Sequence, residues 1–295
     1  MSRQLNYEKV CMGFAANRSD RENYLLLKSD YRLRLFTQEF PHIKGKFLDI
    51  GCGGGTTTEE LANFYQEAEI YGCDISSKTI ELAKKSGSGN VHYSLIKRQI
   101  LPYKDNFFDT AICLDVLEHV PDIFFFVKEA KRVLKKNGLF YLVVPCEGQP
   151  FTLTRLFNKL KIFDKLTFKH LGHIHPEFSQ DYISGFLTGF NFAVLKKKFS
   201  YHLMSQIVTF FQYYMVKEIM ELILGKSQAE SYFNRTIVKK SVKTDVRKDI
   251  IMMIARDLLF KISVLTSIFG KLENRIFTDL EFTSGKVHLF LRNIK

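Results

Sequence analysis

The residues with the clearest chemical use lie in one short stretch, residues 47–55. Phe47 to Ile50 indicate the end of a buried strand, and Gly51, Gly53 and Gly55 follow in a tight turn. Glycine lets backbone N–H groups approach a ligand with no Cβ in the way. A strand, a glycine turn and the start of a helix together form a nucleotide site, which this stretch therefore predicts.

The spacing of the glycines narrows the choice of nucleotide. A dinucleotide site has glycine at the first, third and sixth positions of the turn, and here these positions are Gly51, Gly53 and Thr56. Asp49 stands two residues before the first glycine. A carboxylate there can face a cationic group but repels a pyrophosphate, so the pattern favours a cofactor with a cationic part.

A second carboxylate follows the next strand, expected at residues 69–73. Asp74 lies 23 residues after Gly51 and can accept hydrogen bonds from both hydroxyls of a ribose. Ile75 can then pack against an adenine ring. Asp74 could also cap the helix expected at residues 76–85, and the two roles do not exclude each other.

The stretch around Asp49 closely resembles motif I of the class I S-adenosylmethionine-dependent methyltransferases. The resemblance covers about residues 45–200 and is greatest to the branch of quinone, sterol and sugar methyltransferases. Beyond motif I it continues, in order, through residues 71–75, 101–103, 108–115, 116–120 and 131–139.

The resemblance implies S-adenosylmethionine as the cofactor. By analogy, Asp49 and the glycine turn hold its methionine part, Asp74 holds the ribose, and two apolar side chains flank the adenine. The cofactor-binding residues implied in this way are Asp49, Gly51, Cys52, Gly53, Gly55, Asp74, Ile75, Gln99 and Leu114.

Lys97 departs from the pattern of the family. Most relatives have an acid at this position, which accepts hydrogen bonds from the adenine amino group, and a lysine cannot accept. Three explanations stay open: backbone groups and Gln99 bind the adenine edge, the cofactor binds more weakly, or the loop is shifted by one residue.

Three histidines are candidates for the catalytic base. His119 follows the strand expected at residues 107–114, where ligands of parallel sheets bind, and an imidazole can take a proton near neutral pH. Alternatively, it shapes the pocket without proton transfer. His173 and His175 lie in a loop that, by resemblance, lines the acceptor pocket. No carboxylate or third histidine has a recognisable metal spacing beside them, so no metal is predicted.

Composition limits the classes of partner. The 295 residues are 46% hydrophobic and carry a formal charge of +12, but no run of five Lys or Arg occurs, so a nucleic acid is not the expected partner. The five cysteines show no metal spacing and indicate reduced thiols. Without an apolar N-terminal signal segment, the prediction is a cytoplasmic protein.

The expected fold is α/β: a Rossmann-like, doubly wound, seven-stranded sheet with a helical insertion before the last strand. A helical cap spans residues 1–44, the cofactor-binding core 45–202, the insertion 203–283 and the final strand 284–295. The apolar stretches 204–224 and 250–269 of the insertion carry too many charges to span a membrane. They predict amphipathic helices that pack on each other, in a homodimer, or on a membrane surface.

These features predict methyl transfer from S-adenosylmethionine to oxygen or carbon of a small or lipid-like acceptor. One alternative is a methyltransferase acting on RNA or protein, which would use the basic insertion for docking. The other is a non-catalytic S-adenosylmethionine-binding protein, which would account for Lys97.

Overall fold

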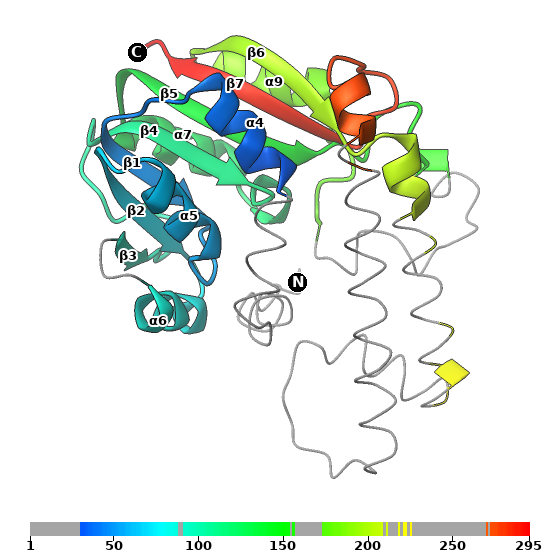
Figure 1. Cartoon of the computed structure of the whole chain (residues 1–295). Coiled ribbons are helices and arrows are strands. Elements are labelled where there is room, and N and C mark those ends of the chain that lie inside the picture. Colours follow the sequence, from blue (N-terminus) through cyan, green and yellow to red (C-terminus); the bar gives the residue numbers. More distant parts are fainter. Residues whose placement is uncertain are drawn as a thin grey trace.

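The computed structural model describes residues 30–87, 91–153, 155–156, 173–208, 211, 218, 221–222, 225, 270 and 272–295. The strands are β1 Gly45–Ile50, β2 Ala68–Asp74, β3 Val91–Leu95, β4 Phe108–Leu114, β5 Leu134–Pro145, β6 Phe192–Ser200 and β7 Lys286–Asn293 (Figure 1). The helices with assigned bounds are α4 Tyr31–Glu39, α5 Thr56–Phe64, α6 Ser77–Ser86, the 3-10 turn Leu117–His119, α7 Ile123–Val133 and α9 Gln180–Gly189.

All seven strands form one sheet in the order β3-β2-β1-β4-β5-β7-β6. β1 to β5 pair in parallel, and β7 is antiparallel to both of its neighbours. The chain first builds outward from β1 through β2 to β3 and then crosses to β4 on the other side of β1. This topology confirms the predicted fold and places the reversal of strand order between β1 and β4, where such sheets bind ligands.

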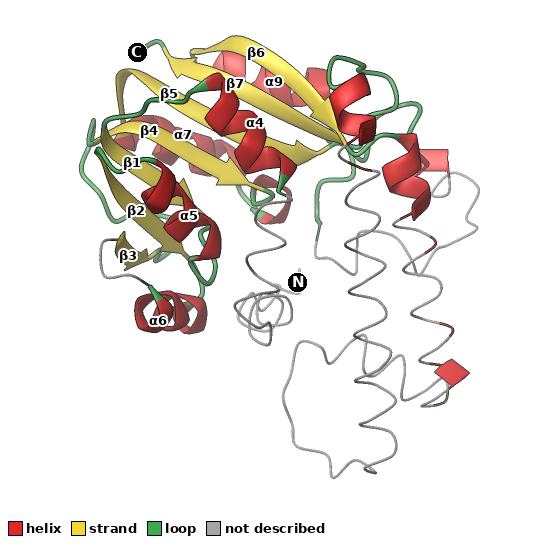
Figure 2. Ribbon diagram, in the orientation of Figure 1, coloured by secondary structure: helices red, strands yellow, loops and turns green. Residues whose placement is uncertain are grey.

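Helices cover both faces of the sheet (Figure 2). On one face, α4, α5 and α6 bury apolar residues such as Phe36, Leu61 and Ile80. On the other, α7 and α9 pack against a second cluster. The sequence of α7 explains its position, because the Asp122 side chain caps it by accepting from the backbone N–H of Phe125, and its buried residues recur every three or four positions.

The two ends of the predicted insertion meet near the last residue of β6, Ser200, and the first residue of β7, Lys286. The Glu273 carboxylate accepts the backbone N–H groups of Met204 and Ser205, and Asn274 accepts that of Tyr201. The apolar stretches 204–224 and 250–269 lie mostly outside the described residues, as do residues 1–29 of the predicted cap. Among the described residues, no helix has the length and hydrophobicity needed to cross a bilayer.

Candidate active site

The glycine turn after β1 is tied to the neighbouring strand. The backbone N–H groups of Gly51 and Cys52 both donate to the carbonyl of Cys73, at 2.7 and 3.0 Å. Gly51, Gly53 and Gly55 all have positive φ, a conformation in which glycine carries no steric penalty. The turn then leads directly into α5, as its sequence predicted.

Gly53 differs from the other two glycines in what surrounds it. A Cβ at Gly51 would lie 2.3 Å from Val116, and one at Gly55 would lie 2.5 Å from the Tyr93 hydroxyl, so packing within the protein excludes larger residues at both positions. A Cβ at Gly53 would meet no atom of the described residues within 4 Å. The described part of the chain therefore leaves the Gly53 backbone open to a ligand at the carboxyl edge of the sheet.

Asp74 connects the turn after β1 to the loop after β2. One carboxylate oxygen accepts the Gly53 N–H at 2.9 Å, and the other accepts the Ser76 N–H at 2.8 Å. Ser76, rather than Asp74, is the N-cap of α6 and accepts the Thr79 N–H. Asp74 thus orders both loops. Beside it, Ile75 is 44% exposed and available for contact with a ring.

Asp49 is buried beneath the glycine turn. Its carboxylate accepts the Thr58 hydroxyl of α5 at 2.7 Å. Burial raises the pKa of Asp49 to about 6; the negative charge of Asp74 adds to the rise, and the Thr58 hydrogen bond opposes it. A positive group placed nearby would stabilise the ionised form of this carboxylate.

Gln99 lies in the loop that follows β3. Lys97 and Ile100 form an isolated bridge around Arg98 and Gln99, which both have positive φ. The Gln99 Oε1 atom is buried and has no hydrogen-bond partner among the described residues, whereas Lys97 is exposed. This oxygen can accept from a donor outside the protein, so Gln99 can supply the acceptor that Lys97 cannot. Leu114, at the end of β4, is half-buried against the apolar cluster of α5 and α6.

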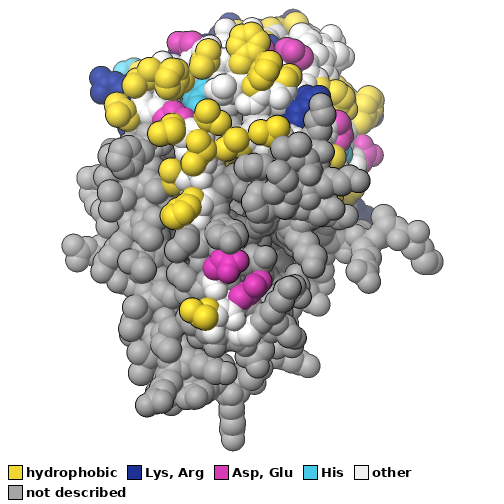
Figure 3. Space-filling model, turned by 90° about the vertical axis from the view of Figure 1, so that its right-hand side faces the viewer, with side chains coloured by type: hydrophobic (Ala, Val, Ile, Leu, Met, Phe, Trp, Pro, Cys, Tyr) yellow, Lys and Arg dark blue, Asp and Glu magenta, His cyan; other side chains and the backbone are white. Residues whose placement is uncertain are grey.

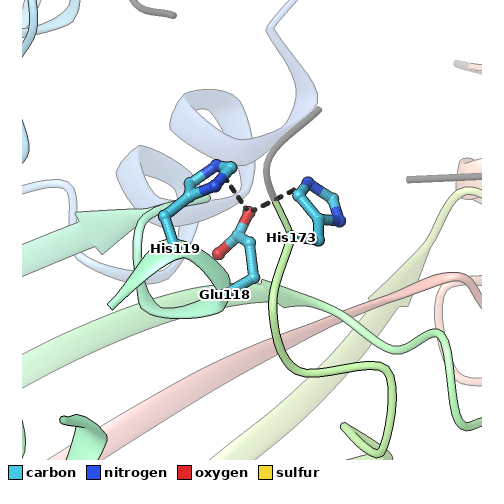
Figure 4. Close-up of side chains that lie close together, drawn as sticks. All are labelled: Glu118, His119 and His173. Atoms are coloured by element: carbon cyan, nitrogen blue, oxygen red, sulfur yellow. Dashed lines mark ion pairs between the residues drawn. The ribbon is translucent and has the colours of Figure 1, made fainter. Parts of the chain in front are cut away.

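Beyond β4, a carboxyl group and two imidazoles come together (Figure 4). The Nε2 atoms of His119 and His173 each lie 3.9 Å from Glu118 Oε1, and the two rings are 5.0 Å apart. One ligand atom from each of these residues lies within 4.8 Å of the others, close enough to hold a cation. No sequence pattern revealed this group, because His173 reaches it from a distant loop.

Glu118 is the least exposed member of this group. Burial and the negative charge of Asp115 raise the pKa of Glu118 well above its usual range, which favours the neutral acid. Its Oε2 atom is buried with no hydrogen-bond partner among the described residues. The backbone N–H of Ile174 donates to the carbonyl of Glu118 at 3.0 Å, and this bond holds the His173 loop against the turn after β4.

His175 has a different environment from His173. Its Nε2 atom lies 2.8 Å from the Val120 carbonyl and its Nδ1 atom lies 3.0 Å from Glu177, while its ring stacks on Phe178. Both ring nitrogens of His175 are thus in contact with protein groups outside the cluster of Glu118, His119 and His173.

Asp115 forms an ionic network that no sequence pattern predicts. It accepts from Arg32 of α4 and from Lys286 of β7, both at 2.7 Å. Burial alone would raise the pKa of Asp115, but Lys286 and Arg32 outweigh this effect and hold it well below its usual range. The network fastens α4 over the carboxyl end of β4.

The fold is that of Rossmann-like nucleotide-binding proteins, because it combines this strand order with a glycine turn after β1 and a carboxylate after β2. Comparison with known families agrees with this fold, since residues 48–142 match the family described as "Methyltransferase domain". The chain is similar to the ubiquinone biosynthesis O-methyltransferase of Pelagibacter ubique, with 36% identity over 38% of this chain and 46% of that protein, so this match spans less than half of that relative. It is 31% identical to the enzyme of that name from Coxiella burnetii, over 59% of this chain and 79% of that protein.

The chain belongs to the class I S-adenosylmethionine-dependent methyltransferases, as the resemblance predicted. Its fold is also that of phosphoethanolamine N-methyltransferase 2 of Haemonchus contortus, solved in complex with S-adenosyl-L-methionine. That comparison has a TM-score of 0.54 at 13% identity and covers 97% of this chain and 60% of that one.

The residues at the carboxyl edge of the sheet fit the cofactor of this family. Gly53 leaves space beside the turn in the described part of the chain, the Asp74 carboxylate and the exposed Ile75 follow β2 beside that turn, and Gln99 offers a buried acceptor. The family's usual acid is absent at Lys97, but the buried Gln99 oxygen has the chemistry to replace it.

Proposed function

We propose that the protein transfers a methyl group from S-adenosylmethionine to a hydroxyl oxygen of a small, lipid-like aromatic acceptor. The observation that supports this best is the position of Glu118, His119 and His173 directly beyond β4, next to the glycine turn. Val116, two residues before Glu118, packs against Gly51, so this group lies beside the glycine turn that we assign to the cofactor. The relatives named ubiquinone biosynthesis O-methyltransferase act at oxygen, in agreement with a site rich in proton acceptors.

Each part of the site has a proposed role. Asp49 and the turn formed by Gly51, Cys52, Gly53 and Gly55 hold the methionine part of the cofactor. Asp74 accepts from the ribose hydroxyls, Gln99 from the adenine amino group, and Ile75 and Leu114 pack on the adenine ring. This assignment uses the space beside Gly53 and the Gln99 oxygen, which has no partner among the described residues.

When bound, the cofactor supplies a methyl group that its sulfonium makes electrophilic. The work of the protein is then to align the acceptor, exclude water and remove the hydroxyl proton. His119 and His173 offer imidazole nitrogens beside the acceptor position, and α4, fastened by the bond from Arg32 to Asp115, covers this end of the sheet.

Methyl transfer can be tested with the purified chain, S-adenosylmethionine carrying a labelled methyl group, and matched acceptors. A catechol with a short prenyl tail is expected to be labelled at oxygen, at a higher kcat/KM than catechol without the tail. Phosphoethanolamine, an acceptor with an amino nitrogen, is the control and is expected to remain unlabelled. Label found in RNA or protein, with none in the prenylated catechol, would contradict the proposal.

The insertion is proposed to bring the enzyme to a membrane surface where such an acceptor dissolves. Residues 201–295 contain 15 Lys and Arg against 9 Asp and Glu, a balance that favours anionic headgroups. Apolar side chains gather on the described part of the face where the insertion begins and ends (Figure 3). Exposed apolar residues close in sequence to the two ends of the insertion are Leu203, Met204, Ile207, Ile276 and Phe282.

Vesicle flotation distinguishes this proposal from a homodimer interface. The protein is expected to float with vesicles containing anionic lipid at low salt and to be partly released at high salt, because charges are screened beyond about 8 Å at physiological ionic strength. Vesicles of neutral lipid are the control. A chain that stays in solution at every salt concentration and sediments as a dimer would assign the insertion to subunit packing instead.

A further inference from the structure

Glu147 contacts the candidate base His173 from the end of the neighbouring strand. It lies just beyond β5, and one of its carboxylate oxygens meets the Nδ1 atom of His173. Both side chains are only 9% exposed. Nothing in the sequence pattern marked Glu147, and the methyltransferase motifs give it no role.

This contact can fix the tautomer of the imidazole. A carboxylate that accepts a hydrogen bond from Nδ1 of His173 keeps the proton on that nitrogen. The other ring nitrogen, Nε2, then faces Glu118 Oε1 at 3.9 Å. In a dry site such a contact is stronger than in water, and it holds both the tautomer and the orientation of the ring.

His119 is less well prepared for the same task. Its side chain is 24% exposed, against 9% for His173. His173 is also held through its backbone neighbour, because the Ile174 N–H donates to the Glu118 carbonyl. A catalytic base must be held in place before the substrate binds, and His173 meets this requirement.

We propose that Glu147 is a positioning residue that keeps Nδ1 of His173 protonated, so that Nε2 of His173 is the atom that takes the proton from the acceptor hydroxyl. The inference rests on the proposed O-methyl transfer. As the acceptor oxygen bonds to the methyl carbon, the bond from that carbon to sulfur breaks and its electron pair stays on sulfur. The hydroxyl proton passes to Nε2 of His173.

The positioning part is tested without any acceptor. Nitrogen NMR of the imidazoles in the full-length chain with S-adenosylhomocysteine reports which ring nitrogen of His173 carries the proton, and His173→Gln assigns the signal. The wild type is expected to show the Nδ1-protonated form, and Glu147→Gln is expected to shift His173 toward the Nε2-protonated form. A His173 signal that is the same in both proteins would overturn the role of Glu147.

The catalytic part is tested by kinetics with the prenylated catechol. Glu147→Gln and His173→Gln are each expected to lower kcat about 100-fold, with KM changed less than about threefold, because a misplaced base affects the transition state and not binding. Their double variant should be little worse than either single variant. Glu177→Gln is the matched control, since Glu177 makes a similar contact with His175, and its kcat should be unchanged.

Two further results would overturn the assignment of His173 as the base. One is a loss of kcat in His119→Gln with none in His173→Gln. The other is activity that a chelator abolishes and a divalent cation restores, because Glu118, His119 and His173 would then hold the cation. If no tested acceptor is methylated, the proposed function fails, while the NMR result still decides whether Glu147 positions His173.

Discussion

Replacing Gly53 with valine is expected to lower the affinity for S-adenosylhomocysteine by at least about 100-fold, which corresponds to about 2.7 kcal/mol. The space beside Gly53 lies where the turn meets the carboxyl edge of the sheet, and a branched side chain would occupy the place of the ligand. The N–H of Gly53 also donates to Asp74, so displacement of the turn would move the proposed ribose acceptor as well.

Calorimetric titration of the wild type and Gly53→Val measures this effect. Gly53 has φ of +53°, so the control must separate ligand exclusion from backbone strain. Gly53→Ala does this, because alanine meets the same positive φ but adds only a Cβ, which would meet no described atom within 4 Å. Equal affinities in the wild type and Gly53→Val would contradict the assignment of the turn to the cofactor.

The parts of the fold that are encoded locally were predictable from the sequence. The glycine turn, the carboxylate after β2 and the apolar runs of the strands each depend on residues close together in the chain. The strands expected at residues 69–73 and 107–114 are observed at Ala68–Asp74 and Phe108–Leu114. The predicted final strand joins the sheet as Lys286–Asn293, although it follows the insertion, and the structure shows it between β5 and β6.

The site itself depends on contacts that no local pattern records. His173 and His175 are two residues apart and looked equivalent in the sequence, yet one meets Glu118 and Glu147 and the other is engaged by Val120 and Glu177. The sequence predicted no metal site, because spacing reveals only ligands close to His173 and His175 in the chain. The structure brings Glu118 and His119, from beyond β4, next to His173. This contact depends on the path of the loop that carries His173 and not on sequence spacing.

The network around Asp115 shows the same dependence on tertiary structure. Arg32 precedes the sheet and Lys286 begins its last strand, so nothing local joins them to a residue beyond β4. Asp30 completes the network by accepting from Arg32 at 2.6 Å. These contacts fasten the start of α4 to the carboxyl edge of the sheet, while its apolar residues pack on one face.

Replacing Arg32 with methionine is expected to lower the free energy of unfolding by about 3 kcal/mol at neutral pH, because Asp30 loses its cationic partner and Asp115 keeps only Lys286. Burial opposes ionisation of Asp30 and Asp115, but in the wild type Arg32, together with Lys286 at Asp115, keeps the pKa of both groups below the usual value. A lowered pKa contributes stability above the unfolded-state value, and this contribution is lost as the pH falls through the folded-state value.

The difference between Arg32→Met and the wild type should therefore shrink as the pH falls from neutral toward about 4, where the freed carboxylates take up protons. Urea unfolding at several pH values measures it. Arg34→Met is the control, because Arg34 lies on the same helix over the Tyr31 ring, and it should cost less than about 1 kcal/mol. An Arg32→Met protein as stable as the wild type at neutral pH would show that α4 is held by its apolar face alone, through Leu33, Leu35 and Phe36.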